Sequence, residues 1–278
     1  MQIIETVDNL KILLNKFKNN TIGFVPTMGA LHAGHASLIK KSKMENDITI
    51  VSVFVNKRQF NDQNDYVNYP RTIENDIELL NSLSCNILFF PENNDIYKNY
   101  EGCKIDFQGL DKIYEGEFRP GHFQGVVDIV YRFFQIINPT NAYFGAKDFQ
   151  QLAIIKLMTK QMNLKTNIIA CEILREKSGL AMSSRNKRLQ KDELEQAPNI
   201  YKIITQFSKN INKSDKPSII INDITKAIDK NSLLKTEYIV FCDENSLKTI
   251  DSFKESKNIR LCIAVWCGEI RLIDNLRL

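Results

Sequence analysis

The chain has 278 residues, of which 43% are hydrophobic and 25% charged, and its formal net charge is +4. This size is long for one domain and comfortable for two, and the composition is ordinary for a globular protein. The weak basic excess contains no dense Lys/Arg block with interleaved aromatic residues, which argues against a nucleic-acid partner but is compatible with an anionic small substrate. No apolar stretch approaches the roughly 20 residues that span a bilayer, and residues 1–6 lack a signal-peptide pattern, so we expect a cytoplasmic protein without a membrane partner.

The first 170 residues alternate between strand-like and helix-like runs. Strands are predicted at residues 22–25, 47–55, 85–91, 142–144 and 166–174. Helices are predicted at residues 37–42, 72–83, 123–137 and 148–162. This alternation predicts an α/β domain, in which a Rossmann-like parallel sheet carries helices on both faces. Ligands of such sheets bind in the loops that follow the carboxyl ends of the strands.

The remainder of the chain has a different pattern. Residues 187–210 and 218–231 are predicted to be helical, and strands are predicted at 237–242, 259–265 and 269–273, the last two as a hairpin. We therefore expect two domains, a Rossmann-like one over residues 1–174 and a smaller α+β one over residues 175–278.

The cysteines form no C-x-x-C pair, and most lie in strand-like apolar runs. In a chain of this size they are predicted to be reduced packing residues rather than disulfide partners or zinc ligands. The six are Cys85, Cys103, Cys171, Cys242, Cys262 and Cys267.

The turn between the first predicted strand and helix, residues 26–35, holds two of the chain's three histidines, His32 and His35. Helix N-termini carry unpaired N–H groups and a partial positive charge, and glycine lets the backbone approach a ligand closely. Residues three apart share one face of a helix, so the two imidazoles are predicted to lie on one face of a turn suited to binding phosphate. The alternative is a tight turn with two surface histidines.

Three other segments place polar side chains after strand-like runs. Asn56 and Gln59 follow the second strand and could be ordinary loop residues. The run 145–151 opens a helix with Lys147 and Asp148, where the aspartate could simply be a cap. The run 182–186 contains Ser183, Ser184 and Arg185, which could cap the next helix and face solvent.

Together these segments supply groups that bind anions: two imidazoles, a lysine, an arginine, hydroxyls and helix-start amides. The two carboxamides could hold a polar organic substrate. The chain lacks both the G-x-G-x-x-G fingerprint and a Walker A loop, which argues against a dinucleotide dehydrogenase and a P-loop kinase. The third histidine, His122, lies at a helix start marked by Pro120 and Gly121, where it could cap, support or catalyse.

The order and the sequences of these segments resemble the pantothenate synthetase (pantoate–β-alanine ligase) family of the nucleotidyltransferase superfamily. The matching pieces are PTMGALHAGHASLI at 26–39, FVNKRQF at 54–60, YPRT at 69–72, GHFQGV at 121–126, FGAKDFQQL at 144–152 and MSSRN at 182–186. A lone H-x-G-H would imply only the wider superfamily, whereas six ordered segments that span more than half of the chain are specific.

The resemblance implies an ATP-dependent ligase that joins (R)-pantoate to β-alanine. ATP adenylates the pantoate carboxylate and releases diphosphate, and the β-alanine amine then attacks the acyl adenylate and releases AMP. The resemblance further implies a need for Mg²⁺, a second domain that closes over ATP, and a homodimer.

The family's functional residues carry over by position. His32, His35, Lys147 and Arg185 become the catalytic group, with His35 as proton donor. The ATP-binding set becomes Met28, Gly29, Ala30, Leu31, His32, Ala33, Gly34, His35, Gly145, Ala146, Lys147, Asp148, Leu174, Met182, Ser183, Ser184 and Arg185. Gln59, Gln151 and Asn56 would bind pantoate and β-alanine, and Asp76 would help to place Mg²⁺.

The chain departs from the family pattern at Lys57, Asp128, Arg132 and Ala146, which puts loop conformation and substrate affinity in question rather than the reaction. Two other functions stay open. One is a nucleotidyltransferase that leaves the nucleotide on a phosphorylated product, and the other is a nucleotide-binding module without catalysis. Retention of all four catalytic groups argues against the second.

Overall fold

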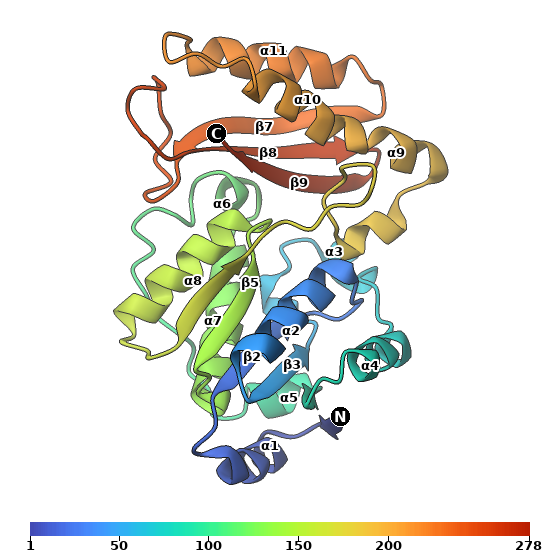
Figure 1. Cartoon of the computed structure of the whole chain (residues 1–278), viewed down its shortest axis with the longest axis vertical. Coiled ribbons are helices and arrows are strands. Elements are labelled where there is room, and N and C mark those ends of the chain that lie inside the picture. Colours follow the sequence, from blue (N-terminus) through green and yellow to red (C-terminus); the bar gives the residue numbers. More distant parts are fainter. The chain divides into compact units, whose positions relative to one another are not determined.

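The computed structural model describes residues 1–278, which form two compact units (Figure 1). The first unit contains residues 1–146 and 150–172, and the second contains residues 147–149 and 173–278. The short segment 147–149 therefore packs with the second unit although its neighbours in sequence belong to the first. None of the helices combines the length and the apolar composition that a membrane span requires.

The first unit is built on one parallel sheet of six strands in the order β1-β4-β3-β2-β5-β6, which confirms the predicted α/β class. The strands are β1 (Gln2–Ile4), β2 (Ile22–Thr27), β3 (Ile48–Val53), β4 (Ile87–Phe89), β5 (Asn141–Gly145) and β6 (Asn167–Cys171). From β2 the chain runs outward through β3 to β4, and β5 then returns to the other side of β2. This reversal is the kind of switch point at which open α/β sheets bind ligands.

Helices cover both faces of this sheet because successive strand residues point to opposite sides. Phe24 and Ile50 pack with α7 (His122–Ile137) in one apolar cluster, whereas Val25 and Val51 pack with α2 (Ala33–Glu45) and α4 (Ile73–Ser82) in another. The helical segments are α1 (Val7–Leu14), η1 (Asn15–Phe17), α2 (Ala33–Glu45), η2 (Lys57–Gln59), α3 (Gln63–Val67), α4 (Ile73–Ser82), α5 (Asn93–Ile96), α6 (Glu115–Phe118), α7 (His122–Ile137) and α8 (Phe149–Gln161).

The second unit contains an antiparallel sheet in the order β7-β8-β9, formed by β7 (Leu234–Asp243), β8 (Ile259–Cys267) and β9 (Ile270–Arg277). The pairing of β8 with β9 confirms the predicted hairpin. Its helical segments are η3 (Ser184–Arg188), α9 (Lys191–Gln196), α10 (Pro198–Ser208) and α11 (Pro217–Asp229). Ile204 of α10 and Ile228 of α11 share an apolar cluster with Phe241 and Leu261, so these helices cover one face of the sheet.

The predicted helical stretch 187–210 is divided into three pieces. Pro198 is the first residue of α10, and proline at this position suits a helix start but not a helix interior. Sequence patterns also did not indicate β1 or the short helices α3, α5 and α6, since segments of three to five residues are too short for periodicity to be detected.

All six cysteines are buried free thiols, as predicted. Burial raises the pKa of Cys85 and of Cys103 to about 11, so both remain protonated at neutral pH.

Candidate active site

The loop that follows β2 adopts an unusual backbone conformation that leads directly into α2. Gly29 has φ of 82° and Ala30 has φ of 50°, so two successive residues lie in the left-handed region. Glycine accepts this region without cost, whereas alanine is strained there and needs support from its surroundings. A β-carbon on Gly29 would also crowd the side chains of Val53 and Asp76.

Asp76 on α4 provides that support. Its Oδ2 accepts a hydrogen bond from the Ala30 N–H at 2.9 Å, and its Oδ1 accepts one from the Leu31 N–H at 2.8 Å. The side chain is only 2% exposed, and the Thr72 hydroxyl donates to Oδ1 at 3.3 Å. Hydrogen bonds to a charged acceptor are about twice as strong as neutral ones, so the carboxylate holds the loop firmly in its strained form.

His32 and His35 form a capping box at the start of α2. The His32 Nδ1 accepts from the Gly34 N–H at 3.1 Å, and the His35 Nδ1 accepts from the His32 N–H at 3.4 Å. An accepting Nδ1 carries no proton, so each neutral ring bears its proton on Nε2 as a hydrogen-bond donor. The ring centroids are 4.0 Å apart. Both rings thus carry an Nε2–H group close to a helix N-terminus, where negative charge is favoured.

The polar residues after β3 contact the same loop. Gln59 Nε2 lies 2.9 Å from the sulfur of Met28, and Asn56 Nδ2 lies 3.3 Å from Gln59 Oε1. Asn56 also accepts from the Tyr97 hydroxyl at 2.7 Å. Burial raises the pKa of Tyr97, so the phenol stays neutral and remains a donor. The structure therefore brings together Met28, Asn56 and Gln59, all predicted site residues, whereas Tyr97 had no signal in the sequence.

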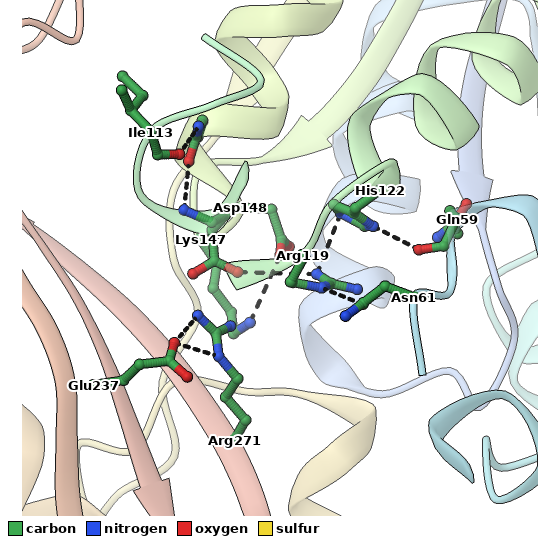
Figure 2. A network of polar contacts seen from close by, with 11 residues as sticks. Gln59, Asn61, Ile113, Arg119, His122, Lys147, Asp148, Glu237 and Arg271 are labelled. Atoms are coloured by element: carbon green, nitrogen blue, oxygen red, sulfur yellow. Dashed lines mark hydrogen bonds and ion pairs between the residues drawn. The ribbon is translucent and has the colours of Figure 1, made fainter. Parts of the chain in front are cut away.

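His122 supports this region through the backbone. Its Nδ1 lies 2.7 Å from the Gln59 carbonyl oxygen, and its Nε2 lies 3.2 Å from Arg119 Nη1 (Figure 2). A carbonyl only accepts and a guanidinium only donates, so the ring is the neutral tautomer with its proton on Nδ1. His122 thus links Arg119 to the residue predicted to hold pantoate.

Gly125 of α7 allows η2 to lie against that helix. A β-carbon at this position would overlap the backbone carbonyl of Arg58 and crowd the Cα of Gln59. In addition, Asn56 Nδ2 donates to the Gly125 carbonyl at 2.9 Å. Close packing against backbone atoms fixes where Gln59 lies, because backbone atoms cannot rotate away as the end of a side chain can.

The Gly125→Ala variant tests this contact by the sign of its effect. Inside an uncrowded helix the change stabilises by roughly 1 kcal/mol. Here we expect a loss of about 1–3 kcal/mol in the free energy of unfolding, because the methyl group must displace η2. Urea unfolding measures the effect, with the exposed Gln135→Ala on the same helix as control. A more stable Gly125→Ala variant would contradict the packing described.

The carboxyl end of β5, beside β2, holds Gly145 and Ala146, and the Ala146 N–H donates to the Cys171 carbonyl at 2.7 Å. Two successive glutamines of α8 differ sharply. Gln150 is buried and bonds to Leu110, Ile113 and Glu115 through its amide group. Gln151 is half-buried and its amide makes no hydrogen bond, so of the two only Gln151 has an amide available to a ligand, and its predicted binding of pantoate stays a prediction.

The remaining predicted site residues lie in the second unit. Lys147 Nζ is 3.9 Å from Asp148 Oδ1 in an ion pair. The Met182 N–H donates to the Leu174 carbonyl at 3.0 Å. Ser183 caps η3 by accepting from the Arg185 N–H at 3.3 Å. Capping is the alternative role that the sequence left open for Ser183.

Arg175 fixes the segment that leads to Ser183. It forms a bidentate ion pair with the buried Asp274 of β9, in which Nη1 lies 2.7 Å from Oδ2 and Nη2 lies 2.9 Å from Oδ1. It also donates to the Gly179 carbonyl at 3.1 Å, and its guanidinium lies 3.5 Å from the centre of the Tyr201 ring. Planar pairing and stacking of this kind hold arginine in one orientation.

The residues present do not form a direct magnesium site. Mg²⁺ requires near-octahedral oxygen ligands, but both oxygens of the buried Asp76 already accept backbone N–H groups. No cluster of three or more His, Cys, Asp or Glu side chains is arranged to hold a metal ion. The predicted part of Asp76 in placing Mg²⁺ does not fit this geometry, and its contacts assign it to the histidine loop.

The departures from the family pattern are accommodated locally. Lys57 begins η2, which still forms with Asn56 as its cap. Asp128 accepts from the Cys103 N–H at 2.9 Å, and Arg132 donates to the Ile96 carbonyl at 2.8 Å. These two residues therefore tie α7 to residues 96–103, and their effect on substrate affinity stays a prediction.

Comparison with known proteins identifies relatives over the full length. Residues 2–277 match the family model described as pantoate-beta-alanine ligase. A pantothenate synthetase from Bacteroides thetaiotaomicron is 44% identical over 279 residues, covering 100% of this chain and 99% of the relative. One from Flavobacterium psychrophilum is 44% identical over 282 residues, covering 100% of each protein.

Solved structures agree with these sequence matches. The crystal structure of pantothenate synthetase from Thermus thermophilus superposes with a TM-score of 0.92 at 32% identity, covering 99% of each chain. A pantoate-beta-alanine ligase from Francisella tularensis, complexed with beta-gamma ATP and beta-alanine, has a TM-score of 0.82 at 38% identity over 99% of this chain and 97% of its own. With the family model matched from end to end, this chain belongs to the pantoate–β-alanine ligase family.

Proposed function

We propose that this protein condenses (R)-pantoate with β-alanine in a reaction driven by ATP, giving pantothenate, AMP and diphosphate through a pantoyl adenylate. The observation that carries the proposal is the histidine loop. Asp76 holds it in a strained conformation, and its two imidazoles present Nε2–H donors at the start of α2. Strain kept at such a place by a buried carboxylate is typical of a preorganised site.

The first chemical step brings a carboxylate to an α-phosphate, so two negative groups must approach each other. Donors fixed in advance where negative charge develops lower the barrier of such a step. We assign this task to His32 and His35, whose Nε2–H groups donate hydrogen bonds to the phosphate oxygens and to the departing diphosphate. Lys147 and Arg185 neutralise phosphate oxygens, and Ser183 and Ser184 donate hydrogen bonds to them.

Pantoate carries hydroxyl and carboxylate groups, which carboxamides recognise by donating and accepting hydrogen bonds. We assign its binding to Gln59 and Gln151, with Asn56 holding Gln59 in place. Support comes from the contact of Gln59 with Met28 and from the unpaired amide of Gln151. A second step follows, in which the amine of β-alanine attacks the acyl carbon and AMP leaves.

Mg²⁺ enters this proposal as part of the nucleotide. It would be held by phosphate oxygens and water, as is usual for Mg²⁺ with nucleotides, and it would offset phosphate charge. The homodimeric assembly and the cytoplasmic location implied by the family are likewise proposed here. Sedimentation of the purified protein at several concentrations checks the assembly, and imaging of a tagged chain checks the location.

A reaction without β-alanine tests the function most directly. Mass spectrometry should detect pantoyl adenylate held by the enzyme, because the intermediate has no amine to react with. When both substrates are added, AMP should accumulate with pantothenate in equal amounts. Hydrolysis of ATP at a rate that does not depend on pantoate would contradict the proposal.

The same assay separates the other functions. A stable nucleotide conjugate of a phosphorylated compound would indicate a nucleotidyltransferase. ATP binding by calorimetry without turnover of pantoate would indicate a binding module. Neither has a specific observation in its favour, and the full-length family match favours the ligase.

A further inference from the structure

Asn275 of β9 is a buried polar residue, and burying a polar side chain costs free energy unless hydrogen bonds compensate for it. It is 2% exposed, and its Nδ2 donates to the backbone carbonyl of Lys147 at 2.9 Å. Leu272 lies in the apolar cluster with α10 and α11, and successive strand residues alternate between faces. Asn275 therefore points to the opposite face of the sheet, where it meets residues 147–149.

Arg260 of β8 fixes the orientation of this amide. Its Nη1 donates to Asn275 Oδ1, and its Nη2 is paired with Glu244 Oε1. Since guanidinium groups only donate, the amide oxygen must face Arg260 and the NH₂ group must face Lys147. The hydrogen bond from Asn275 to Lys147 therefore depends on Arg260, which is itself held by its ion pair with Glu244.

The same arginine also contacts the far end of the segment. Its guanidinium lies 4.2 Å from the centre of the Phe149 ring. Residues 147–149 are consequently held at Lys147 by a hydrogen bond and at Phe149 by stacking. These two contacts explain why three residues between β5 and α8 cluster with the second unit.

We propose that Asn275, oriented by Arg260, is a positioning residue that sets the backbone of Lys147 so that its ammonium group meets the phosphates of ATP. Lys147 is the group through which Asn275 acts, and the proposal rests on the role given to Lys147 above. A lysine side chain is long and flexible, so a fixed backbone limits the region its charge explores. Small misplacements of a catalytic group lower rates by as much as about 100-fold.

The Asn275→Asp variant removes the hydrogen bond to Lys147 and adds one negative charge, while it keeps the size of the side chain. The shape is kept and an oxygen still accepts from Arg260, but the donor to the Lys147 carbonyl is replaced by a second oxygen. We expect the dissociation constant for ATP, measured by calorimetry without pantoate, to rise about tenfold, and kcat to fall about 10- to 100-fold. The KM for pantoate should stay near the parental value.

A double-mutant cycle distinguishes positioning from a general structural effect. In the Lys147→Ala background, where the ammonium is already absent, Asn275→Asp should change ATP binding by no more than about twofold. Asn231→Asp is the matched control. Asn231 likewise donates through Nδ2, to Gln196 at 2.7 Å, and accepts through Oδ1, from the Leu233 N–H at 3.0 Å. It should leave ATP binding unchanged.

Parental ATP binding in Asn275→Asp, or a full tenfold loss that persists without the Lys147 side chain, would overturn the proposal. The thermal midpoint of each variant is measured in parallel, and Arg260→Lys provides a second variant that keeps the charge but loses the fork that orients the amide. It should weaken ATP binding in the same direction, and unchanged binding would count against the proposal. Because ATP binding is read without turnover, these results are independent of whether pantoate is the substrate.

Discussion

Replacing His35 with alanine should lower kcat for AMP formation by about 100-fold or more, the usual cost of removing a group that donates a proton or stabilises developing charge. The reason lies in the direction of the ring. Its Nδ1 accepts from the His32 N–H, so the proton is on Nε2, from which the ring can donate a hydrogen bond to a phosphate oxygen. Lys147→Ala should have a loss of similar size, because it removes a full positive charge. Steady-state release of AMP with both substrates measures each effect.

The histidine also caps α2, so its removal weakens the helix start as well as the chemistry. His35→Asn separates the two effects, since its oxygen can still accept from the His32 N–H while the Nε2–H donor is lost. We expect His35→Asn to recover the thermal midpoint lost in His35→Ala but not the rate. Near-parental kcat in either variant would remove His35 from the mechanism.

Asp76→Ala should destabilise the protein by about 2–5 kcal/mol, because it leaves two buried N–H groups without an acceptor. Those donors are the amides of Ala30 and Leu31, at 2.9 and 2.8 Å from the carboxylate. The left-handed conformation of Ala30 would relax once it is no longer held, so kcat should fall with stability. Urea unfolding and AMP release measure the two effects on the same sample.

Two further variants sharpen this test. Asp76→Asn keeps one accepting oxygen but turns an NH₂ group toward the other amide, so we expect an intermediate loss of stability. Glu74→Ala removes an exposed carboxylate from the same first turn of α4, and should cost only about 0.3–1 kcal/mol through the helix dipole. Equal losses in Asp76→Ala and Glu74→Ala would show that the loop does not depend on the buried carboxylate.

Much of the architecture could be predicted because it follows from local patterns. The β-branched run 47–55 predicted a strand covered on both faces, and β3 is such a strand. The pattern of residues 259–273 predicted the β8–β9 hairpin. In contrast, α1 follows a Thr6 cap and was missed, because its eight residues give only two turns of periodicity.

The candidate site likewise contains some residues that the local sequence indicated and others that it did not. His32 and His35 could be proposed because two glycines and two histidines stand together in a predicted strand-to-helix turn, although spacing alone left a tight turn with surface histidines equally open. Tyr97, Asp274 and Asn275 were not found as supporting residues, because their partners lie 41, 99 and 128 positions away in sequence. The resemblance pointed to Asp76, but for placing Mg²⁺, since the sequence does not reveal which amides face a carboxylate.

The sequence by itself determined the family, the order of the longer strands and helices other than α1, and the chemical types of the groups that we propose to meet ATP and pantoate. These follow from short segments whose meaning lies in neighbouring residues. Only the tertiary structure decided which residues support these groups through hydrogen bonds. Asp76 accepts from the strained loop at Ala30, His122 contacts the Gln59 carbonyl, and Asn275 donates to the Lys147 carbonyl. A hydrogen bond depends on distance and direction between atoms, and those are fixed by how remote segments pack rather than by what stands beside each residue in the chain.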